Sequence, residues 1–231
     1  MNPVNDADRG PALRRVRGVI ERLVGDGTAV ANSDVTVHDL FPVALGAAEG
    51  EALRDWIVRE QATRTIEVGL GYGLSTLHIC EGLLATAGEA MACHVAIDPY
   101  QARRFSGLGL QLLEEAGVAG MVEHHEEESQ LALPRFLGEG RTFDVAFVDG
   151  NHRFDWVFVD LFYLGRLLRP GGIVFLDDYQ LPGVARATLF YQTNLGWRLE
   201  EVSAPDDLHQ WAILRTAVVQ DTRPFDYFVE F

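Results

Sequence analysis

Three carboxylates with a spacing suited to chemistry stand directly after two apolar runs in the second half of the chain. Asp149 follows residues 143–148, and Asp177 with Asp178 follows residues 173–176. If these runs are neighbouring parallel strands, whose axes lie about 4.8 Å apart, the acids at their carboxyl ends converge on one point. Crowded carboxylates raise one another's pKa unless a cation lies between them, and Mg²⁺ or Ca²⁺ prefers such oxygen ligands. The pattern therefore predicts a divalent-cation site. The alternative is that these acids cap helices or bind a cofactor without metal.

His152 is the candidate base beside these acids, because it follows Asp149 by three residues. Histidine has an ordinary pKa near neutrality, so it can take a proton from a reacting hydroxyl. Asp149 and His152 are therefore the predicted catalytic residues, with a local hydrogen bond at a helix start as the alternative for His152. Asp149 is also expected to contact the cofactor. The other six histidines show no metal-ligand spacing: His38, His78, His94, His124, His125 and His209.

A second stretch of chemical interest is residues 65–76, which read T-I-E-V-G-L-G-Y-G-L-S-T. An apolar run is followed by a glycine-rich turn and then by a segment with helical spacing, which predicts a strand, a tight turn and a helix. Such a turn brings a ligand against bare backbone and a helix N-terminus. The residues expected to contact a cofactor here are Glu67, Gly69, Gly71, Gly73 and Ser75.

Leu74 decides which cofactor this turn favours. A dinucleotide fingerprint, G-x-G-x-x-G, needs a glycine at the position where Leu74 stands. A nicotinamide oxidoreductase is therefore disfavoured, although it stays an alternative. Asp98 directly follows residues 94–97, the second predicted strand. It is therefore placed to accept hydrogen bonds from ribose hydroxyls, with a turn cap beside Pro99 as the alternative.

The elements that must position these residues alternate between apolar runs and helical patterns, which predicts a doubly wound, mainly parallel α/β sheet. Two apolar runs near the end, residues 197–202 and 211–215, have no helix between them, so they should form an antiparallel pair at the sheet edge. Residues 1–60 predict a helical segment before the sheet, with helices near residues 13–23 and 50–61 and an irregular stretch over 28–48. We expect this segment to form a substrate cap beside a single compact domain at residues 61–231.

Three segments together resemble one family. They are E-V-G-L-G-Y-G-L-S-T (67–76), V-D-G-N-H (148–152) and L-L-R-P-G-G-I-V-F-L-D-D-Y (167–179). They are similar to class I S-adenosylmethionine-dependent methyltransferases, and within these to natural-product O-methyltransferases that act on sugars. That group is related in plan to catechol and caffeoyl-CoA O-methyltransferases. The resemblance covers roughly residues 40–215 and implies a Rossmann-like fold with seven strands.

The resemblance also implies a role for individual residues. In metal-dependent members, magnesium is held by the positions that correspond here to Asp149, Asp177 and Asp178. Glu128 and Ser129 follow the third strand, where this family binds the adenine edge. Members that act on sugars often have an acidic residue two positions after the first metal ligand, and its carboxylate serves as the catalytic base. Here that position is Asn151, whose amide cannot act as a base. The resemblance thus implies S-adenosylmethionine and Mg²⁺ as cofactors and a small-molecule hydroxyl as methyl acceptor.

The composition of the chain limits its partners and its location. At 231 residues and a formal charge of -15, the chain lacks the basic surface that nucleic acids and anionic membranes attract, so neither is an expected partner. The first residues lack the apolar core of a signal peptide, which favours a cytoplasmic location. Cys80 and Cys93 are expected to be two buried thiols, with a disulfide as the alternative. An aromatic tail makes a homodimer plausible: Phe225, Tyr227, Phe228 and Phe231.

Three alternative functions stay open at this point. A metal-independent methyltransferase would use the same glycine turn, with the acids binding substrate. A non-catalytic protein that binds a cofactor or metabolite would tolerate loss of Asp149, and a nicotinamide oxidoreductase would bind NAD in a cofactor titration.

Overall fold

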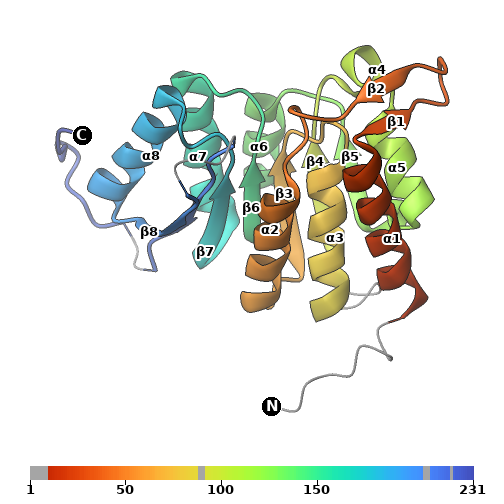
Figure 1. Cartoon of the computed structure of the whole chain (residues 1–231). Helices are drawn as coiled ribbons and strands as arrows, with labels where there is room; N and C mark the ends of the chain where they lie inside the picture. Colours follow the sequence, from red (N-terminus) through yellow and green to blue (C-terminus); the bar gives the residue numbers. More distant parts are fainter. Residues whose placement is uncertain (1–9, 88–91, 205–208, 219–220) are drawn as a thin grey trace. The chain divides into compact units, whose positions relative to one another are not determined.

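The computed structural model describes residues 10–87, 92–204, 209–218 and 221–231 of the chain (Figure 1). The chain divides into two compact units. One comprises Met1–Arg64 with Leu70–Glu126, and the other comprises Thr65–Gly69 with Glu127–Phe231. The cap over residues 1–60 and the single domain over 61–231 remain predictions.

Among the described residues, seven strands form one sheet in the order β5-β4-β3-β6-β7-β9-β8, and two shorter strands pair separately. Parallel pairs join β3 to β6, β6 to β7 and β4 to β5, whereas β9 runs antiparallel to both β7 and β8. The predicted mainly parallel sheet with an antiparallel C-terminal pair is therefore confirmed. The strands are β3 (Arg64–Val68), β4 (Cys93–Ile97), β5 (Val122–His125), β6 (Phe143–Val148), β7 (Leu168–Leu176), β8 (Arg198–Val202) and β9 (Ala212–Arg215).

In the first unit, α1 (Pro11–Asp26) and α2 (Ala47–Arg59) both pack against α3 (Leu74–Thr86). Helix α3 buries ten consecutive residues, from Leu74 to Leu83, so it has no solvent-facing stripe over this length. The buried carboxylate of Glu81 accepts a hydrogen bond from Arg17 Nε at 2.7 Å. Because a buried charge is costly without a partner, this ion pair fixes α1 onto α3.

Two local predictions in this unit are wrong. Residues 28–48 contain a small antiparallel pair, β1 (Thr28–Val30) and β2 (Val37–Asp39), where the sequence pattern predicts an irregular stretch. Strands of three residues give too short an alternation to recognise from sequence. The single helix expected over residues 101–116 is divided into α4 (Gln101–Arg104) and α5 (Leu108–Ala116). It is interrupted because Ser106 and Gly107 both have a positive φ, which no α-helix accommodates.

In the second unit, α6 (Ser129–Gly138), α7 (Phe154–Leu167) and α8 (Pro182–Leu195) pack in sequence, α6 on α7 and α7 on α8. Tyr191 is buried between helices and donates a hydrogen bond to Phe158 O at 2.7 Å. Strand β7 begins at Leu168, five residues earlier than expected, because Pro170-Gly171-Gly172 lies inside the strand. The positive φ of Gly171 fits this irregular start.

Neither Cys80 nor Cys93 is in a disulfide with another described residue; Cys80 is buried, as predicted, but Cys93 is partly exposed, so the prediction of burial is wrong for Cys93. Among the described residues, no helix is long and apolar enough to cross a membrane. One further short element, the 3₁₀ turn η2 (Ala119–Met121), leads into β5.

Candidate functional site

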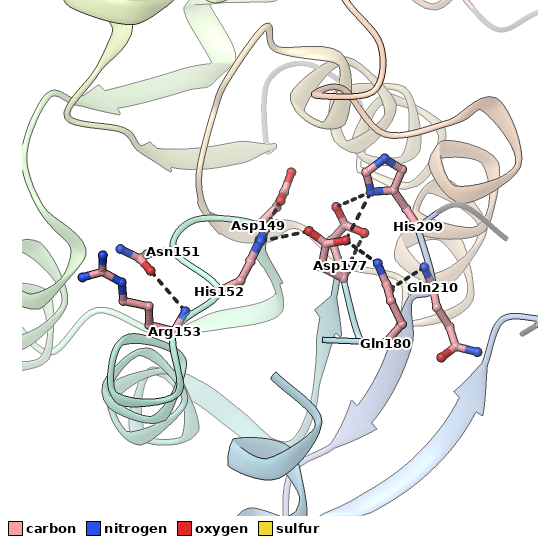
Figure 2. Close-up of polar contacts among 9 residues, drawn as sticks. Asp149, Asn151, His152, Arg153, Asp177, Gln180, His209 and Gln210 are labelled. Atoms are coloured by element: carbon pink, nitrogen blue, oxygen red, sulfur yellow. Dashed lines mark hydrogen bonds and ion pairs between the residues drawn. The ribbon is translucent and has the colours of Figure 1, made fainter. Parts of the chain in front are cut away.

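The acids predicted to converge do lie together at the carboxyl ends of β6 and β7. These strands are parallel neighbours, with Val148 opposite Leu176. Asp149 continues from β6, and Asp177 continues from β7 with its amide donating to Val148 O at 3.1 Å. Figure 2 shows Asp149, His152 and Asp177 at this edge, together with His209. The local sequence places Asp149 and Asp177 one residue beyond their strands and Asp178 two residues beyond, and the parallel pairing brings them to the same edge.

His152 lies between two of these carboxylates. Its Nε2 is 3.3 Å from Asp149 Oδ1, and its Nδ1 is 2.9 Å from Asp178 Oδ2. Burial lowers the pKa of His152, but hydrogen bonds to Asp149 and Asp178 outweigh it and raise that pKa. Burial raises the pKa of Asp149, which the contact with His152 partly offsets, whereas hydrogen bonding to His152 lowers the pKa of Asp178. The imidazole therefore bridges Asp149 and Asp178 and partly neutralises both.

His209 joins the same cluster, although its spacing in the sequence gave no indication of a ligand. Its Nδ1 lies 3.3 Å from Asp178 Oδ1 and 3.8 Å from Asp177 Oδ2. One ligand atom from each of these three residues lies within 4.8 Å of the others, a spacing that can hold a metal ion. No signal in the sequence identifies His209, because its position depends on the register between β7 and β9. Continuing the β7–β9 pairing three residues beyond Leu176 and Ala212 brings His209 opposite Tyr179.

The backbone around Asp177 and Asp178 is held in an unusual conformation. Asp178 has a φ of 53°, in the left-handed region, and its amide donates to Asp177 Oδ1 at 2.6 Å. Gln180 Nε2 donates to Asp178 Oδ1 at 2.7 Å, while Gln180 Oε1 accepts from the amide of Gln210 at 2.8 Å. Non-glycine residues adopt this conformation at a cost, and they persist in it where neighbouring groups hold them. These contacts fix the two acids and the His209 segment to one another.

The donor set at this edge fits a divalent cation. Asp177 and Asp178 supply carboxylate oxygens, which Mg²⁺, Mn²⁺ and Ca²⁺ all accept, and His209 supplies a nitrogen. Both ring nitrogens of His209 are buried without a geometrically regular hydrogen bond. Asp149, the third predicted ligand, is outside this group of three and is in contact with His152 instead.

Gly69 begins the glycine turn in close contact with the acid site. Its φ is 100°, and a Cβ at this position would overlap the backbone carbonyl of Asp149. The amide of Asp149 donates to Val68 O at 2.9 Å, which draws the ends of β3 and β6 together. Glycine at residue 69 is therefore required both by conformation and by space.

In the first unit, Asp98 anchors the later part of the same turn. Its Oδ2 accepts from the amides of Leu70 at 3.2 Å and Gly71 at 2.8 Å, and from Gln101 Nε2 at 3.1 Å. Its Oδ1 accepts one bond, from the amide of Tyr100 at 2.7 Å. Gln101, which sequence reasoning did not single out, also donates to Gly71 O at 2.7 Å. The buried carboxylate of Asp98 thus holds the turn in shape.

The remaining predicted cofactor residues have clear positions but no tested role. Gly73 is the N-cap of α3 in the left-handed conformation, so the helix begins at Leu74 and Ser75 lies inside its first turn. Glu67 is fully buried within β3. Glu128 is the N-cap of α6, and the buried Ser129 hydrogen-bonds with Asp160 of α7. Their contacts with a cofactor remain predictions.

A separate cavity of about 450 Å³ lies in the second unit, at the C-terminal ends of α7 and α8. Asn194, Trp197 and Arg223 are among its lining residues. Arg223 pairs with Asp221 and caps the carbonyl of Asn194 at 2.8 Å. None of the acids at the ends of β6 and β7 lines this cavity.

The chain was compared with known proteins at the level of families, sequences and solved structures. Residues 66–179 match the family model described as a methyltransferase domain. The search of curated proteins found no match.

Solved structures similar to this chain include O-methyltransferases. TomG of Streptomyces achromogenes, involved in tomaymycin synthesis and solved with S-adenosylmethionine, is 21% identical, with 90% of each chain covered and a TM-score of 0.64. A putative O-methyltransferase of Klebsiella pneumoniae is 18% identical, covering 94% of this chain and 92% of that one, with a TM-score of 0.65. The O-methyltransferase of Bacillus cereus, solved with S-adenosylhomocysteine, is 15% identical over 94% and 93% of the two chains, with a TM-score of 0.64.

At these identities the structural comparisons establish a shared fold, and the family match covers the glycine turn, the acid after β6 and the acids after β7. The predicted fold and the predicted methyltransferase class are thus confirmed, whereas the resemblance to natural-product members that act on sugars stays a prediction. Residues 66–179 of this chain are a methyltransferase domain, set in the fold of the class I S-adenosylmethionine-dependent methyltransferases.

Proposed function

We propose that the chain transfers the methyl group of S-adenosylmethionine to a hydroxyl of a small organic acceptor, with the help of a divalent cation. The observation that carries this proposal is the convergence of Asp149, His152, Asp177 and Asp178 at the carboxyl ends of neighbouring strands. In open α/β sheets this edge is where ligands bind. The similar O-methyltransferases, two of them solved with the methyl donor or its product, support the same reaction class.

The cofactors would supply the reactive groups. When bound, S-adenosylmethionine supplies an electrophilic methyl group, and a divalent cation supplies Lewis acidity toward the acceptor hydroxyl. Everything else in the mechanism is the work of the chain's own residues, which bind, orient and exclude water.

We assign the methyl donor to the glycine turn and its surrounding residues. Asp98 Oδ2 already accepts three hydrogen bonds, but Oδ1 accepts one and has capacity for a ribose hydroxyl. The turn itself would approach the donor through backbone, because Gly69, Gly71 and Gly73 all have positive φ and no side chain. Glu67, Ser75, Glu128 and Ser129 complete the proposed cofactor contacts.

We assign the acceptor hydroxyl to the acid edge. Because the contacts with Asp149 and Asp178 raise the pKa of His152, the ring must lose a proton before it can act as a base. Nδ1, which lies against Asp178 at the shorter distance of 2.9 Å, would keep its proton, and Nε2 would then be the nitrogen that takes up the acceptor proton. Asp149 Oδ1, 3.3 Å from Nε2, would orient the ring and stabilise its protonated form. Asp177 and Asp178 are the cation ligands that we propose here, whereas Asp149, the third ligand predicted from the sequence, lies against His152 instead.

One observation favours a second candidate, a methyltransferase that needs no metal. His152 and His209 both lie against the carboxylates, so two imidazoles can neutralise the site without a cation. In that mechanism Asp149 and Asp178 hold the base in place, and the acceptor binds through hydrogen bonds alone.

Calorimetric titration with S-adenosylhomocysteine, with NAD as the control, tests the proposal. We expect binding of the first and none of the second. A screen of hydroxyl acceptors with magnesium and with a chelator then separates the two mechanisms, because only the cation-assisted one loses activity in chelator. Absence of S-adenosylhomocysteine binding in folded, cofactor-free protein would refute the proposed reaction. We further propose that the chain is located in the cytoplasm and forms a homodimer.

A further inference from the structure

We propose that His209 is a direct ligand of the cation at this edge, in a set formed by Asp177, Asp178 and His209, and that Asp149 belongs to a separate pair with His152. The inference rests on the proposed function only in that it concerns the cation of the same site. It changes the expected ligand set from three carboxylates to two carboxylates and an imidazole, and with it the class of metal that the site selects.

The distances within the group suit one shared ion. Protein ligands lie about 2.0–2.2 Å from Mn²⁺-like or Zn²⁺-like ions, so two ligands in adjacent positions around one ion are about 3 Å apart. His209 Nδ1 is 3.3 Å from Asp178 Oδ1 and 3.8 Å from Asp177 Oδ2. Small side-chain rotations would bring all three donors to one ion without moving the backbone.

The two carboxylates each direct one oxygen to His209 and use the other elsewhere. Asp177 Oδ1 accepts the amide of Asp178, which leaves Oδ2 on the His209 side. Asp178 Oδ2 contacts His152, which leaves Oδ1 on the His209 side, where Gln180 also donates to it. Ligating carboxylates in metal sites are commonly supported in this way by outer hydrogen bonds.

His209 is held at this position by the chain rather than by its own ring. The amide of Tyr179 donates to Gln210 O at 2.5 Å, and Gln180 Oε1 accepts from the amide of Gln210. The amide of Trp211 donates to Ser203 Oγ at 3.0 Å, which anchors the other side of the segment. Both ring nitrogens of His209 are nevertheless buried without a regular hydrogen bond. The His209 side chain is 20% exposed and its Nδ1 faces the carboxylates of Asp177 and Asp178, so an imidazole on an anchored backbone is already in position to accept an ion there.

Asp149 is separated from this group by a side chain. The ring of His152 contacts Asp149 on one nitrogen and Asp178 on the other. For Asp149 to share an ion with Asp178, the imidazole between them would have to move away. His209 needs no such displacement, so it is the nearer third ligand.

A nitrogen ligand alters metal preference. Mg²⁺ and Ca²⁺ favour all-oxygen sites, whereas Mn²⁺, Fe²⁺ and Co²⁺ accept imidazole readily. We therefore expect the site to bind Mn²⁺ or Co²⁺ more tightly than Mg²⁺, by roughly tenfold or more.

The test uses the full chain, freed of metal with a chelator and titrated with Mn²⁺ alone, with Mg²⁺ as competitor. Pulsed electron paramagnetic resonance on the bound Mn²⁺ reports nitrogen in direct coordination. We expect nitrogen coupling in the wild type and its loss in His209→Asp, which keeps an oxygen ligand and still binds the ion. His209→Ala should weaken Mn²⁺ binding by roughly tenfold or more, and Asp149→Asn should weaken it less.

Two further variants exclude other histidines. His152→Asn should retain the nitrogen coupling. His125→Asn is the matched surface control, because His125 pairs with Glu123 at 2.7 Å and imitates an adventitious histidine–carboxylate site; it should leave binding and coupling unchanged.

Several results would overturn the inference. The first is that the wild type does not bind Mn²⁺. The second is that nitrogen coupling to Mn²⁺ survives in His209→Asp but disappears in His152→Asn or His125→Asn. The third is that Asp149→Asn weakens Mn²⁺ binding more than His209→Ala does. Titration with S-adenosylhomocysteine in chelator separates this failure from failure of the proposed reaction. Binding of that compound without any Mn²⁺ site would overturn the ligand set alone.

Discussion

The backbone carbonyl of Asp149 occupies the space that a side chain on Gly69 would need. The two residues follow β3 and β6, which are parallel neighbours, and Asp149 N also donates to Val68 O at 2.9 Å. The start of the glycine turn and the first acid of the acid edge are therefore packed backbone against backbone. A change at residue 69 should disturb both.

Gly69→Ala is expected to lower the free energy of unfolding by about 3–5 kcal/mol, from a strained positive φ together with overpacking against Asp149. Gly71→Ala is the matched control, because Gly71 also has a positive φ but a Cβ there meets nothing within 4 Å. It should cost only about 1–2 kcal/mol. Urea unfolding of both variants measures the difference, and equal losses would mean that the contact with Asp149 is unimportant.

Asp98→Ala should destabilise the chain and weaken S-adenosylhomocysteine binding. The change leaves the amides of Leu70 and Gly71 without their acceptor, and each buried unsatisfied donor costs about 1–3 kcal/mol. We expect a total loss of about 2–5 kcal/mol in urea unfolding and an affinity reduced by roughly tenfold in calorimetry. Glu126→Ala, at an exposed acid that accepts only a 3.4 Å contact from Ala102 N, serves as control. Unaltered affinity in Asp98→Ala would show that this carboxylate does not shape the cofactor turn.

Asp160 should make the stability of the chain fall as the pH rises. Burial raises its pKa from 3.8 to about 7, against a smaller opposite effect of the hydrogen bond with Ser129. Between these two values the folded state binds the proton more tightly than the unfolded state. The stabilisation is complete below about pH 4 and is lost as the pH rises through about 7.

Asp160→Asn removes this titration while keeping an acceptor for Ser129. Between pH 5 and pH 8 the difference in unfolding free energy between wild type and variant should change by about 2–3 kcal/mol, in favour of the variant at high pH. Urea unfolding at several pH values measures it. Asp155→Asn, an exposed change in the same helix, should give no such trend. A parallel pH dependence of wild type and Asp160→Asn would contradict the assignment.

Asn194 should hold the C-terminal tail onto the second unit. Its buried side chain donates from Nδ2 to Val229 O at 2.9 Å and accepts at Oδ1 from Val229 N at 2.8 Å. Asn194→Ala removes both bonds, so amide hydrogen exchange near Val229 should accelerate, with a loss of about 1–3 kcal/mol in stability. Asn32→Ala, at an exposed residue of the first unit, is the comparison variant. Unchanged exchange in Asn194→Ala would mean that the ring contacts of Phe231 with Phe190 and Arg186 suffice to hold the tail.

The local sequence was enough to predict most of the fold and the position of the acids. Apolar runs, helical spacing and glycine turns are short-range patterns, and each strand-end acid is fixed by the residue at which its strand ends. Asp149, Asp177 and Asp178 therefore lie where their strands predicted. The antiparallel pair β8 and β9 could also be predicted from the sequence, because no helix fits between the last two apolar runs.

The interruption at Ser106 and Gly107 is harder to foresee. The apolar spacing over residues 101–116 continues through the break, and only the positive φ of both residues reveals it. The pair β1 and β2 escapes prediction because three residues carry too little periodicity.

What the sequence alone determined is the order of elements, the family and the strand ends that carry carboxylates, since all of these depend on neighbouring residues. Only the tertiary structure decided that His209 lies against Asp178, 31 residues away along the chain, and that the ring of His152 separates Asp149 from the other acids. The first depends on the register between β7 and β9, and the second on which side-chain rotamer fills the space between two strand ends. Neither register nor rotamer is encoded by residues adjacent in sequence, because both are set by packing between distant segments.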